Sequence, residues 1–298
     1  MKVLCVGQQG QVARALTEQA DGSDVNVVSR GRTEFNILDP QSIRANLIEI
    51  KPDFIINAAA YTAVDKAESD PVAAKALNHT APSNLAKISA EMGLPIVHIS
   101  TDYVFDGQAD CPYVETDTVA PNSVYGLTKL NGEQAVMANN PCHIVLRTAW
   151  VYSPFGSNFV KTMLRLASER DVISIVDDQI GNPTSALDIA LAALTVCQKL
   201  YDNSEDSAWG LYHLAGTGAV SWAGFAKEIF DQSHTLGGPS SSVHSIPTTD
   251  YPTPAKRPGN SQLNCEKLAF EFGVTMPPWQ TSLTTVVERL LNEGELPR

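Results

Sequence analysis

The chain has 298 residues, of which 43% are hydrophobic and 18% are charged, as is ordinary for a globular protein. Its formal net charge of −12 at pH 7 argues against a general nucleic-acid binder and against binding to anionic membrane surfaces, because both need a basic surface. The sequence contains no run of about eighteen apolar residues, so no transmembrane helix is expected.

The five cysteines are scattered along the sequence without a C-x-x-C pair, which indicates reduced thiols and a cytoplasmic location. The N-terminal apolar run superficially suggests a signal peptide, but it is too short and continues directly into a glycine turn. Cys5 lies within that run and is expected to be a small core residue.

The first half of the sequence alternates short apolar runs, typical of buried strands, with segments of helical periodicity. Asp39 and Pro40 are expected to cap and begin one of the helices. This alternation predicts an α/β fold with a Rossmann-like, doubly wound parallel sheet and helices on both faces. The expected strands are 2–7, 24–30, 53–60, 95–100 and 143–150, and the expected helices are 11–20, 39–52, 71–93 and 122–139.

After about Tyr152 the alternation becomes less regular. The elements expected there are helices at 158–169 and 186–200, an extended segment at 173–185 and a strand at 210–216. The segment 236–262 is rich in Pro, Ser and Thr and is expected to be irregular. We therefore expect a Rossmann-like domain at 1–152 and a smaller C-terminal lobe at 153–298, with some segments of the lobe returning to the first domain.

A glycine turn, in the sequence VGQQGQVA, follows the first expected strand. Gly7 and Gly10 stand where this strand ends and the next helix begins. Glycines at this place let the chain turn tightly and bring backbone N–H groups against a pyrophosphate. The alternative is an ordinary strand–helix turn. The position of the two glycines after the first strand of an alternating α/β chain favours dinucleotide binding. Ala13 replaces the third glycine of the usual fingerprint and is its mildest substitute.

The second expected strand ends in VVSRGR, where sites that prefer NAD commonly carry an Asp or Glu. Guanidinium groups bind phosphate oxygens through several donors, so Arg30 and Arg32 suit the 2′-phosphate of NADPH. They could also be solvated loop residues. The sequence therefore favours NADPH as the cofactor, with NADH possible.

Thr101 follows the fourth expected strand, at the edge of the sheet where open α/β folds bind ligands. The later sequence YGLTK places Tyr125 and Lys129 on one face of a helix, although this spacing alone is weak evidence. The Lys129 ammonium and a positive nicotinamide would lower the pKa of the phenol from its usual value of about 10. Tyr125 could then exchange a proton with a carbonyl or alcohol oxygen that Thr101 also holds.

With the glycine turn, the Tyr-x-x-x-Lys pair resembles the extended short-chain dehydrogenase/reductases. Six stretches in the right order sharpen this into a resemblance to the dTDP-4-dehydrorhamnose reductase family over almost the whole chain. They are NAAAYTAVDKAE at 57–68, STDYVFDG at 100–107, YGLTKLNGE at 125–133, LRTAWVYSPFGSNFV at 146–160, DDQIGNPT at 177–184 and RPGNSQL at 257–263.

The resemblance implies an oxidoreductase of cell-surface polysaccharide biosynthesis, which uses NADPH to reduce the C4 ketone of the nucleotide sugar dTDP-4-dehydro-L-rhamnose to dTDP-L-rhamnose. It implies Thr101, Tyr125 and Lys129 as catalytic residues. The residues implied to bind substrate are Thr101, Asp102, Trp150, Asn158 and Arg257. The residues implied to bind the cofactor are Gly7, Gly10, Gln11, Val12, Arg30, Arg32, Asn36, Ile37, Ala58, Ala59, Ala60, Ile99, Tyr125 and Lys129. By this resemblance residues 1–152 bind NAD(P) and residues 153–298 mainly bind substrate.

Three of these substrate residues also have an ordinary structural interpretation. Trp150 ends an apolar strand and could be a core tryptophan. Asn158 could cap a helix instead of hydrogen-bonding the diphosphate, and Arg257 could lie on the surface instead of neutralising it.

Two positions depart from the family's pattern. Asn36 stands where an aspartate normally contacts adenine, so we expect weaker or altered adenine contacts and not their loss. Ala15 stands at the first-helix position where some relatives carry an acidic residue of a magnesium-linked dimer, so no metal is expected. Both a monomer and a homodimer stay open.

Two other functions remain open at this point. A reductase or epimerase of another nucleotide sugar would share these motifs, because the loops after Tyr152 set the identity of the base and sugar. A non-catalytic NADP-binding regulatory subunit could use the same fold, since the regulatory subunit of methionine adenosyltransferase resembles this family. The presence of Thr101, Tyr125 and Lys129 favours an enzyme.

Overall fold

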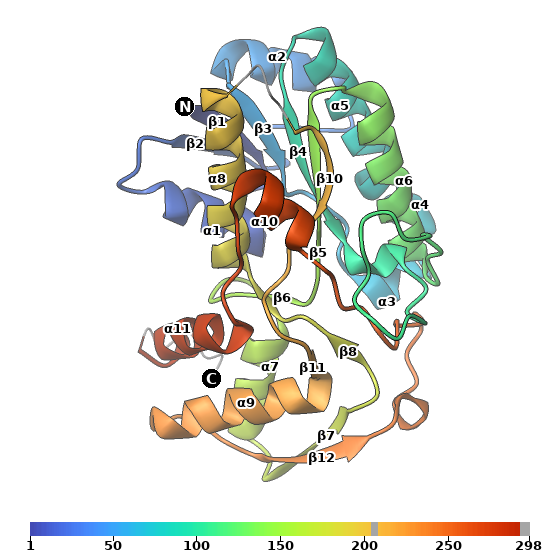
Figure 1. Ribbon diagram of the computed structural model, residues 1–298, viewed down its shortest axis with the longest axis vertical. Coiled ribbons are helices and arrows are strands. Elements are labelled where there is room, and N and C mark those ends of the chain that lie inside the picture. The colour runs from blue at the N-terminus through green and yellow to red at the C-terminus, as the bar shows by residue number, and fades with distance from the viewer. Residues whose placement is uncertain (204–207, 293–298) are drawn as a thin grey trace.

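A six-stranded parallel sheet forms the centre of the computed structural model, which describes residues 1–203 and 208–292 (Figure 1). The strand order is β10-β5-β4-β3-β1-β2, so the strand order reverses beside β1 as in a doubly wound fold. The strands are β1 Lys2–Val6, β2 Asn26–Arg30, β3 Phe54–Asn57, β4 Ile96–Thr101, β5 His143–Thr148 and β10 Gly210–His213. The predicted Rossmann-like parallel sheet is confirmed.

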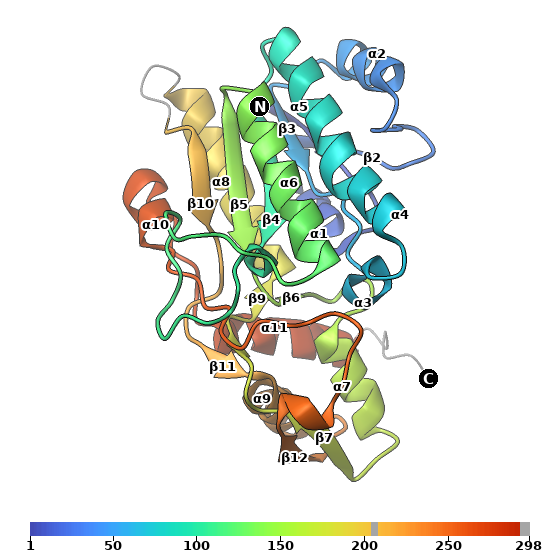
Figure 2. The same cartoon turned by 90° about the vertical axis from the view of Figure 1, so that its right-hand side faces the viewer.

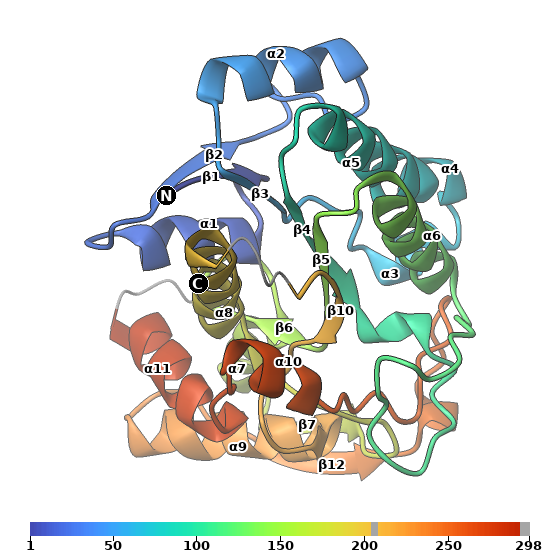
Figure 3. The same ribbon diagram turned by 45° about the horizontal axis from the view of Figure 1, so that its top comes forward.

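Helices cover both faces of this sheet (Figure 3). One face carries α1 Gln11–Ala20 and α8 Ala186–Asp202, and the other carries α2 Pro40–Ile50, α5 Ala81–Glu91 and α6 Val124–Asn139. Alternation along β1 explains both layers, because successive strand side chains point to opposite faces. Val3 and Cys5 join the core under α1 and α8, whereas Leu4 and Val6 join the core under α2 and α5.

The helix boundaries on the second face follow from local sequence. The Asp39 side chain accepts from the Gln41 N–H at 2.9 Å and Pro40 occupies the first position of α2, as predicted. The expected helix at 71–93 is present as α4 Pro71–Lys75, the π-helical turn η1 Ala76–Thr80 and α5. Within η1, Asn78 bonds to the backbone of Tyr61 and donates to the Thr128 hydroxyl at 3.1 Å. It therefore links the segment after β3 to α6.

A second group of elements lies beyond the carboxyl edge of the sheet (Figures 1 and 2). Its helices are α7 Phe159–Ala167, α9 Trp222–Thr235 and α11 Trp279–Asn292. The parallel strands β7 Val172–Val176 and β12 Ser242–Ile246 pair below them. The shorter elements are α3 Val64–Ala67, η2 Asp102–Val104, β6 Val151–Tyr152, β8 Ile180–Gly181, β9 Thr184–Ser185, β11 Val220–Ser221, η3 Thr248–Asp250 and α10 Glu266–Phe272.

The expectation that 236–262 is irregular is wrong at β12. This strand reads SVHSI and buries none of its residues fully, so it carries no apolar run that would identify it. Its partner β7 supplies the register, with Ser242 opposite Val172. β10 lies in the central sheet although it comes late in the chain. The division into a domain at 1–152 and a lobe at 153–298 stays a prediction.

A helix needs about twenty predominantly apolar residues to span a bilayer. Within residues 1–203 and 208–292, no helix is both long and apolar enough to cross a membrane.

Candidate active site

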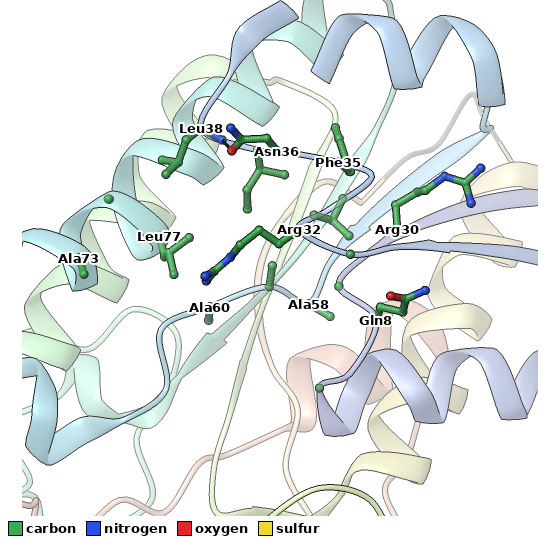
Figure 4. A pocket seen from close by; sticks show the side chains of 17 residues that line it. Gln8, Arg30, Arg32, Phe35, Asn36, Leu38, Ala58, Ala60, Ala73 and Leu77 are labelled. Carbon is green, nitrogen blue, oxygen red and sulfur yellow. Dashed lines mark hydrogen bonds between the residues drawn. The ribbon is translucent and has the colours of Figure 1, made fainter. Parts of the chain in front are cut away.

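A cavity of about 480 Å³ opens at the carboxyl ends of β1, β2 and β3 (Figure 4). Nine of the predicted cofactor residues line it: Gly7, Gly10, Arg30, Arg32, Asn36, Ile37, Ala58, Ala59 and Ala60. Small side chains and backbone dominate this lining, so a flat ring and a phosphate chain can approach the main chain closely. The structure thus brings most of the predicted cofactor residues into one place.

The glycine turn fits a dinucleotide on two observations. Gly7 has a φ of +128°, which side chains rarely adopt, and a Cβ there would lie 3.4 Å from the Ala13 Cβ. Gly10 occupies the N-cap of α1 and offers no side-chain cap. The first N–H groups of the helix are therefore left to an anionic ligand, as a pyrophosphate requires.

The two arginines of the β2 turn differ in direction. Figure 4 shows the Arg32 side chain reaching across the cavity toward Ala60 and Leu77, whereas Arg30 points away from them. Arg30 lies 4.0 Å from the Glu49 carboxylate, a distance that marks a weak surface pair. Arg32 is thus the better placed of the two for a ligand phosphate.

Asn36 lines the same cavity but has a local structural role as well. Its Oδ1 accepts from the Leu38 N–H at 3.1 Å, and its own N–H donates to the Ser42 hydroxyl at 3.0 Å. The side-chain oxygen is therefore occupied by the turn, which leaves the amide NH₂ for a ligand. Sequence reasoning missed six apolar residues that line this cavity: Val6, Phe35, Leu38, Ala73, Ala76 and Leu77. The exposed fraction of Leu38, 40%, is the kind of signal that marks such a wall.

Tyr125 lies in the first turn of α6, which Ser123 caps by accepting from the Gly126 N–H. Burial raises the pKa of Tyr125 to about 12; a hydrogen bond with Thr101 opposes this and the charge of Asp102 adds to it. The lowering expected from Lys129 together with a positive nicotinamide concerns the protein with its cofactor and stays a prediction. The phenol stays protonated, which is the form that a proton donor needs.

Lys129 follows one turn later and is 2% exposed. Its ammonium donates to the Ile99 carbonyl at 2.7 Å, which fixes the side chain against the end of β4. Burial lowers the pKa of Lys129 to about 8, and the Glu133 carboxylate opposes that shift. Lys129 therefore has a pKa close to the physiological range.

Thr101 and Asp102 end β4 and begin η2 beside Tyr125. The Thr101 hydroxyl donates to Asp102 Oδ1 at 2.9 Å and accepts from the Tyr103 N–H at 3.3 Å. Burial raises the pKa of Asp102 to about 6, against hydrogen bonds that include those from Ser261 and Thr101. Thr101, Asp102 and Tyr125 thus form one buried polar cluster at the carboxyl edge of the sheet.

Trp150 is not a plain core residue. It has a φ of +47°, its Nε1–H donates to the Ser261 hydroxyl at 3.1 Å, and it is only partly buried. Its ring stacks on Trp222, with centroids 3.5 Å apart. A non-glycine residue rarely adopts this φ, and the contacts around Trp150 maintain it.

Asn158 has the capping role that the sequence left open. Its Oδ1 accepts from the Lys161 N–H at 3.2 Å at the start of α7. Its amide donates to Gln11 Oε1 at 3.0 Å and to the Ser153 carbonyl at 2.8 Å. Gln11, at the first turn of α1, is thereby tied to the start of α7.

Arg257 lies at a second cavity, of about 790 Å³, formed by α7, β7, Trp222 and the segment after β12. Two of its nitrogens donate to the Asp65 carboxylate, at 3.1 and 2.7 Å. Arg257 is therefore paired with Asp65, and it lines the second cavity. Sequence reasoning missed several polar residues around it: Thr162, Arg170, Gln179, His244, Asp250 and Tyr251.

Comparison with known proteins agrees with this geometry. Residues 1–292 match the family described as the RmlD substrate binding domain. A dTDP-4-dehydrorhamnose reductase of Sinorhizobium fredii is 45% identical over 99% of both chains. The crystal structure of a dTDP-4-dehydrorhamnose reductase from Clostridium acetobutylicum has a TM-score of 0.90 at 39% identity, covering 98% of this chain and 100% of that one. Another from Bacillus anthracis, in complex with NADP, has a TM-score of 0.89 at 33% identity, covering 96% and 98%.

Proposed function

The chain belongs to the dTDP-4-dehydrorhamnose reductase family, and we propose that it uses NADPH to reduce the C4 ketone of dTDP-4-dehydro-L-rhamnose to dTDP-L-rhamnose. The observation that carries this proposal is the full-length similarity to named reductases together with the presence and burial of Thr101, Tyr125 and Lys129. The product is a nucleotide sugar for cell-surface polysaccharides.

NADPH is the cofactor that the cavity beside the glycine turn suits best, with NADH possible. The related structure from Bacillus anthracis holds NADP. In this chain the N-terminus of α1 would take the pyrophosphate, and Arg32 would take the 2′-phosphate. Gln11, Val12 and Ile99 stay predicted cofactor residues; Ile99 supplies the carbonyl that positions Lys129.

The protein's own residues supply the proton chemistry. When bound, NADPH supplies the hydride that adds to the keto carbon. Tyr125 is protonated at neutral pH because burial raises its pKa to about 12, so it can donate to the oxygen as negative charge develops there. Lys129, with its ammonium beside the end of β4, would stabilise the phenolate that remains and hold the nicotinamide ribose.

The substrate would extend from this cluster into the second cavity. Thr101, Asp102 and Trp150 would contact the sugar, and Arg257 would neutralise the diphosphate. Asn158 is committed to its cap and to Gln11, so it would act mainly by shaping this region. The protein would act in the cytoplasm on a small molecule, without nucleic-acid or membrane partners, and as a monomer or homodimer.

The test is turnover with a defined substrate. Purified protein, NADPH and dTDP-4-dehydro-L-rhamnose should give loss of reduced-nicotinamide absorbance and a product with the mass and chromatographic behaviour of dTDP-L-rhamnose. UDP-linked 4-keto sugars form the comparison panel. Faster turnover of one of these would replace the proposal by another nucleotide-sugar reductase. NADPH binding without turnover of any of them would favour a regulatory subunit.

A further inference from the structure

A row of buried ionisable groups continues beyond the predicted catalytic residues. Tyr125, Lys129 and Glu133 are spaced four residues apart on α6, so they share the helix face that packs on β4 and β5. Lys129 is 2% exposed and Glu133 is fully buried. A carboxylate in the interior is costly unless it is paired, so Glu133 needs an explanation.

Arg147 and Ser100 hold the Glu133 carboxylate from the sheet. Arg147 Nε donates to Glu133 Oε1 at 3.0 Å, and its Nη2 donates to Oε2 at 2.8 Å. The Ser100 hydroxyl also donates to Oε1. Ser100 and Arg147 are register partners on β4 and β5, so two adjacent strands present their donors to one carboxylate. This arrangement fixes the carboxylate in place.

The charges around Lys129 alternate in sign along this row. The pKa of His98 on β4 is lowered well below the usual value by burial and then by the Lys129 charge, so His98 is neutral. The Glu133 carboxylate is the negative group that acts on Lys129, and Arg147 is the ion-pair partner of Glu133. Beyond Arg147, burial and then the Arg147 charge lower the pKa of His213 on β10 to about 3. Glu133 is thus the negative group between two buried cations.

The helices α3, α4 and α5 also pack against α6. Their charged side chains are exposed, as in Lys66, Lys75, Lys87 and Glu91, or paired elsewhere, as in Asp65 with Arg257. Asp102 in η2 acts on Tyr125. The π-helical turn η1 contributes Asn78, which donates to Thr128, and carries His79 as its titratable side chain. On β3, Asn57 is an uncharged partner of the His98 ring, 3.1 Å away.

We propose that Glu133, fixed by Arg147 and Ser100, is a positioning residue that keeps the buried Lys129 ammonium protonated while leaving it free to bind the cofactor ribose and to act on Tyr125. This inference rests on the proposed reductase function.

The physical reason is a balance between burial and charge. Burial alone drives an ammonium toward its neutral form, and a nearby carboxylate opposes this. Both Glu133 oxygens accept from Arg147, so Glu133 acts on Lys129 through its field and does not occupy the Lys129 donors. A buried ion pair adds little to stability over a well-packed apolar pair, so an electrostatic role is the better account of its cost.

The test compares Glu133→Gln with Arg147→Met, which disrupt the same ion pair with opposite changes of charge. For each variant, NADPH affinity and the kcat/KM for NADPH are followed against pH, since both report the free enzyme. In the natural protein we expect both quantities to fall as the pH rises past the Lys129 pKa of about 8, and we call this fall the alkaline limb. In Glu133→Gln the alkaline limb should move to a pH lower by about one unit. At pH values above the limbs of both proteins, NADPH affinity and kcat/KM should then be about tenfold lower than in the natural protein.

Arg147→Met leaves Glu133 in place, so its limb should stay or rise. Limbs that stay unmoved in both variants, or that fall together, would overturn the proposal and leave the pair a structural one. Should either single variant fail to fold, the double variant Glu133→Gln/Arg147→Met leaves no buried charge unpaired. Its limb should also lie below that of the natural protein, and an unchanged limb would overturn the proposal.

Glu18→Gln is the matched control, because it removes one carboxylate of an ion pair with Arg289 away from the row. Its limb should not move. The outcomes also separate this inference from the proposed function. Natural protein that binds NADPH but reduces no nucleotide sugar contradicts the function alone. Natural protein that reduces the sugar, with an unmoved limb in Glu133→Gln, contradicts the positioning role alone.

Discussion

The cavity at the glycine turn and the cavity beside Arg257 are built in different ways. The first is lined by residues between 6 and 77, which follow successive strands of the sheet and are mostly small or apolar. The second is lined by residues between 159 and 257, which bring charged and aromatic side chains from several elements. Under the proposed function, the cofactor would be bound by turns that are local in sequence, whereas substrate identity would depend on segments that are distant in sequence.

Long-range contacts hold the second region against the first. Arg257 donates to Asp65, and Asn158 donates to Gln11 at the first turn of α1. The second of these contacts joins the start of α1 to α7. The two regions are therefore distinct in construction. Thr101 and Tyr125 line neither cavity and lie at the carboxyl edge of the sheet, which we call the boundary between the two regions.

The largest effect is expected at that boundary. Tyr125→Phe removes the proton donor while keeping the ring, which packs against Tyr103 at a centroid distance of 5.4 Å. We expect kcat to fall roughly 10²–10⁴-fold, as for other general acids, with NADPH affinity nearly unchanged. Stopped-flow reduction and NADPH titration measure the two quantities. Turnover at the natural rate, with chemistry shown to limit it, would remove Tyr125 from the mechanism.

The next effect should appear only in the second region. Arg257→Met removes a charged donor from the second cavity, so KM for the nucleotide sugar should rise roughly 10–100-fold, in line with charged hydrogen bonds. The affinity for NADPH should not change. Arg165→Met is the control, because Arg165 pairs with Glu169 on the exposed side of α7. An equal rise of KM in both variants would mean that substrate binding depends on the net charge of the protein and not on the position of Arg257.

A smaller effect should appear only in the first region. Arg32→Ala should weaken NADPH about tenfold while leaving NADH nearly unchanged, because only NADPH carries the 2′-phosphate. Arg30→Ala is the matched variant, since the Arg30 side chain points away from Ala60 and Leu77 in Figure 4. Calorimetric titration of both cofactors decides between them. Equal NADPH affinities in all three proteins would show that neither arginine reads the phosphate.

The sequence predicted the first region well because its signals are local. Gly7 and Gly10 follow the first strand of an alternating α/β chain directly, and the structure places them between β1 and α1. The apolar walls Leu38 and Leu77 were missed, since apolar residues at helix starts and in helices resemble ordinary core positions.

The second region was predicted less well for the opposite reason. β12 has no apolar run and is defined only by its pairing with β7. Trp222 was missed because nothing in its local sequence places it against Trp150, seventy-odd residues away. The pairing of Arg257 with Asp65 likewise depends on the whole fold. These contacts join residues that are far apart in the sequence, so local periodicity and spacing do not predict them.

The smallest expected effect concerns stability and pH at the boundary. Burial raises the pKa of Asp102 to about 6 from 3.8, so the folded state holds this proton more tightly than the unfolded state. Asp102 therefore stabilises the fold least above about pH 6, and the stability it contributes is lost between those two pKa values as pH rises. Asp102→Asn should raise Tm by a few degrees at pH 7 but not at pH 4. Calorimetry at both pH values tests this, and an equal change at the two would rule it out.

The most direct test of the account follows the transferred hydrogen. NADPH deuterated at nicotinamide C4, in each of its two stereochemical forms, is incubated with the protein and dTDP-4-dehydro-L-rhamnose, and the product is examined by mass spectrometry and NMR. The account predicts a product one mass unit heavier with one of the two forms, with the deuterium at C4 of the sugar. A product without deuterium from either form, or with deuterium at another carbon, would contradict it.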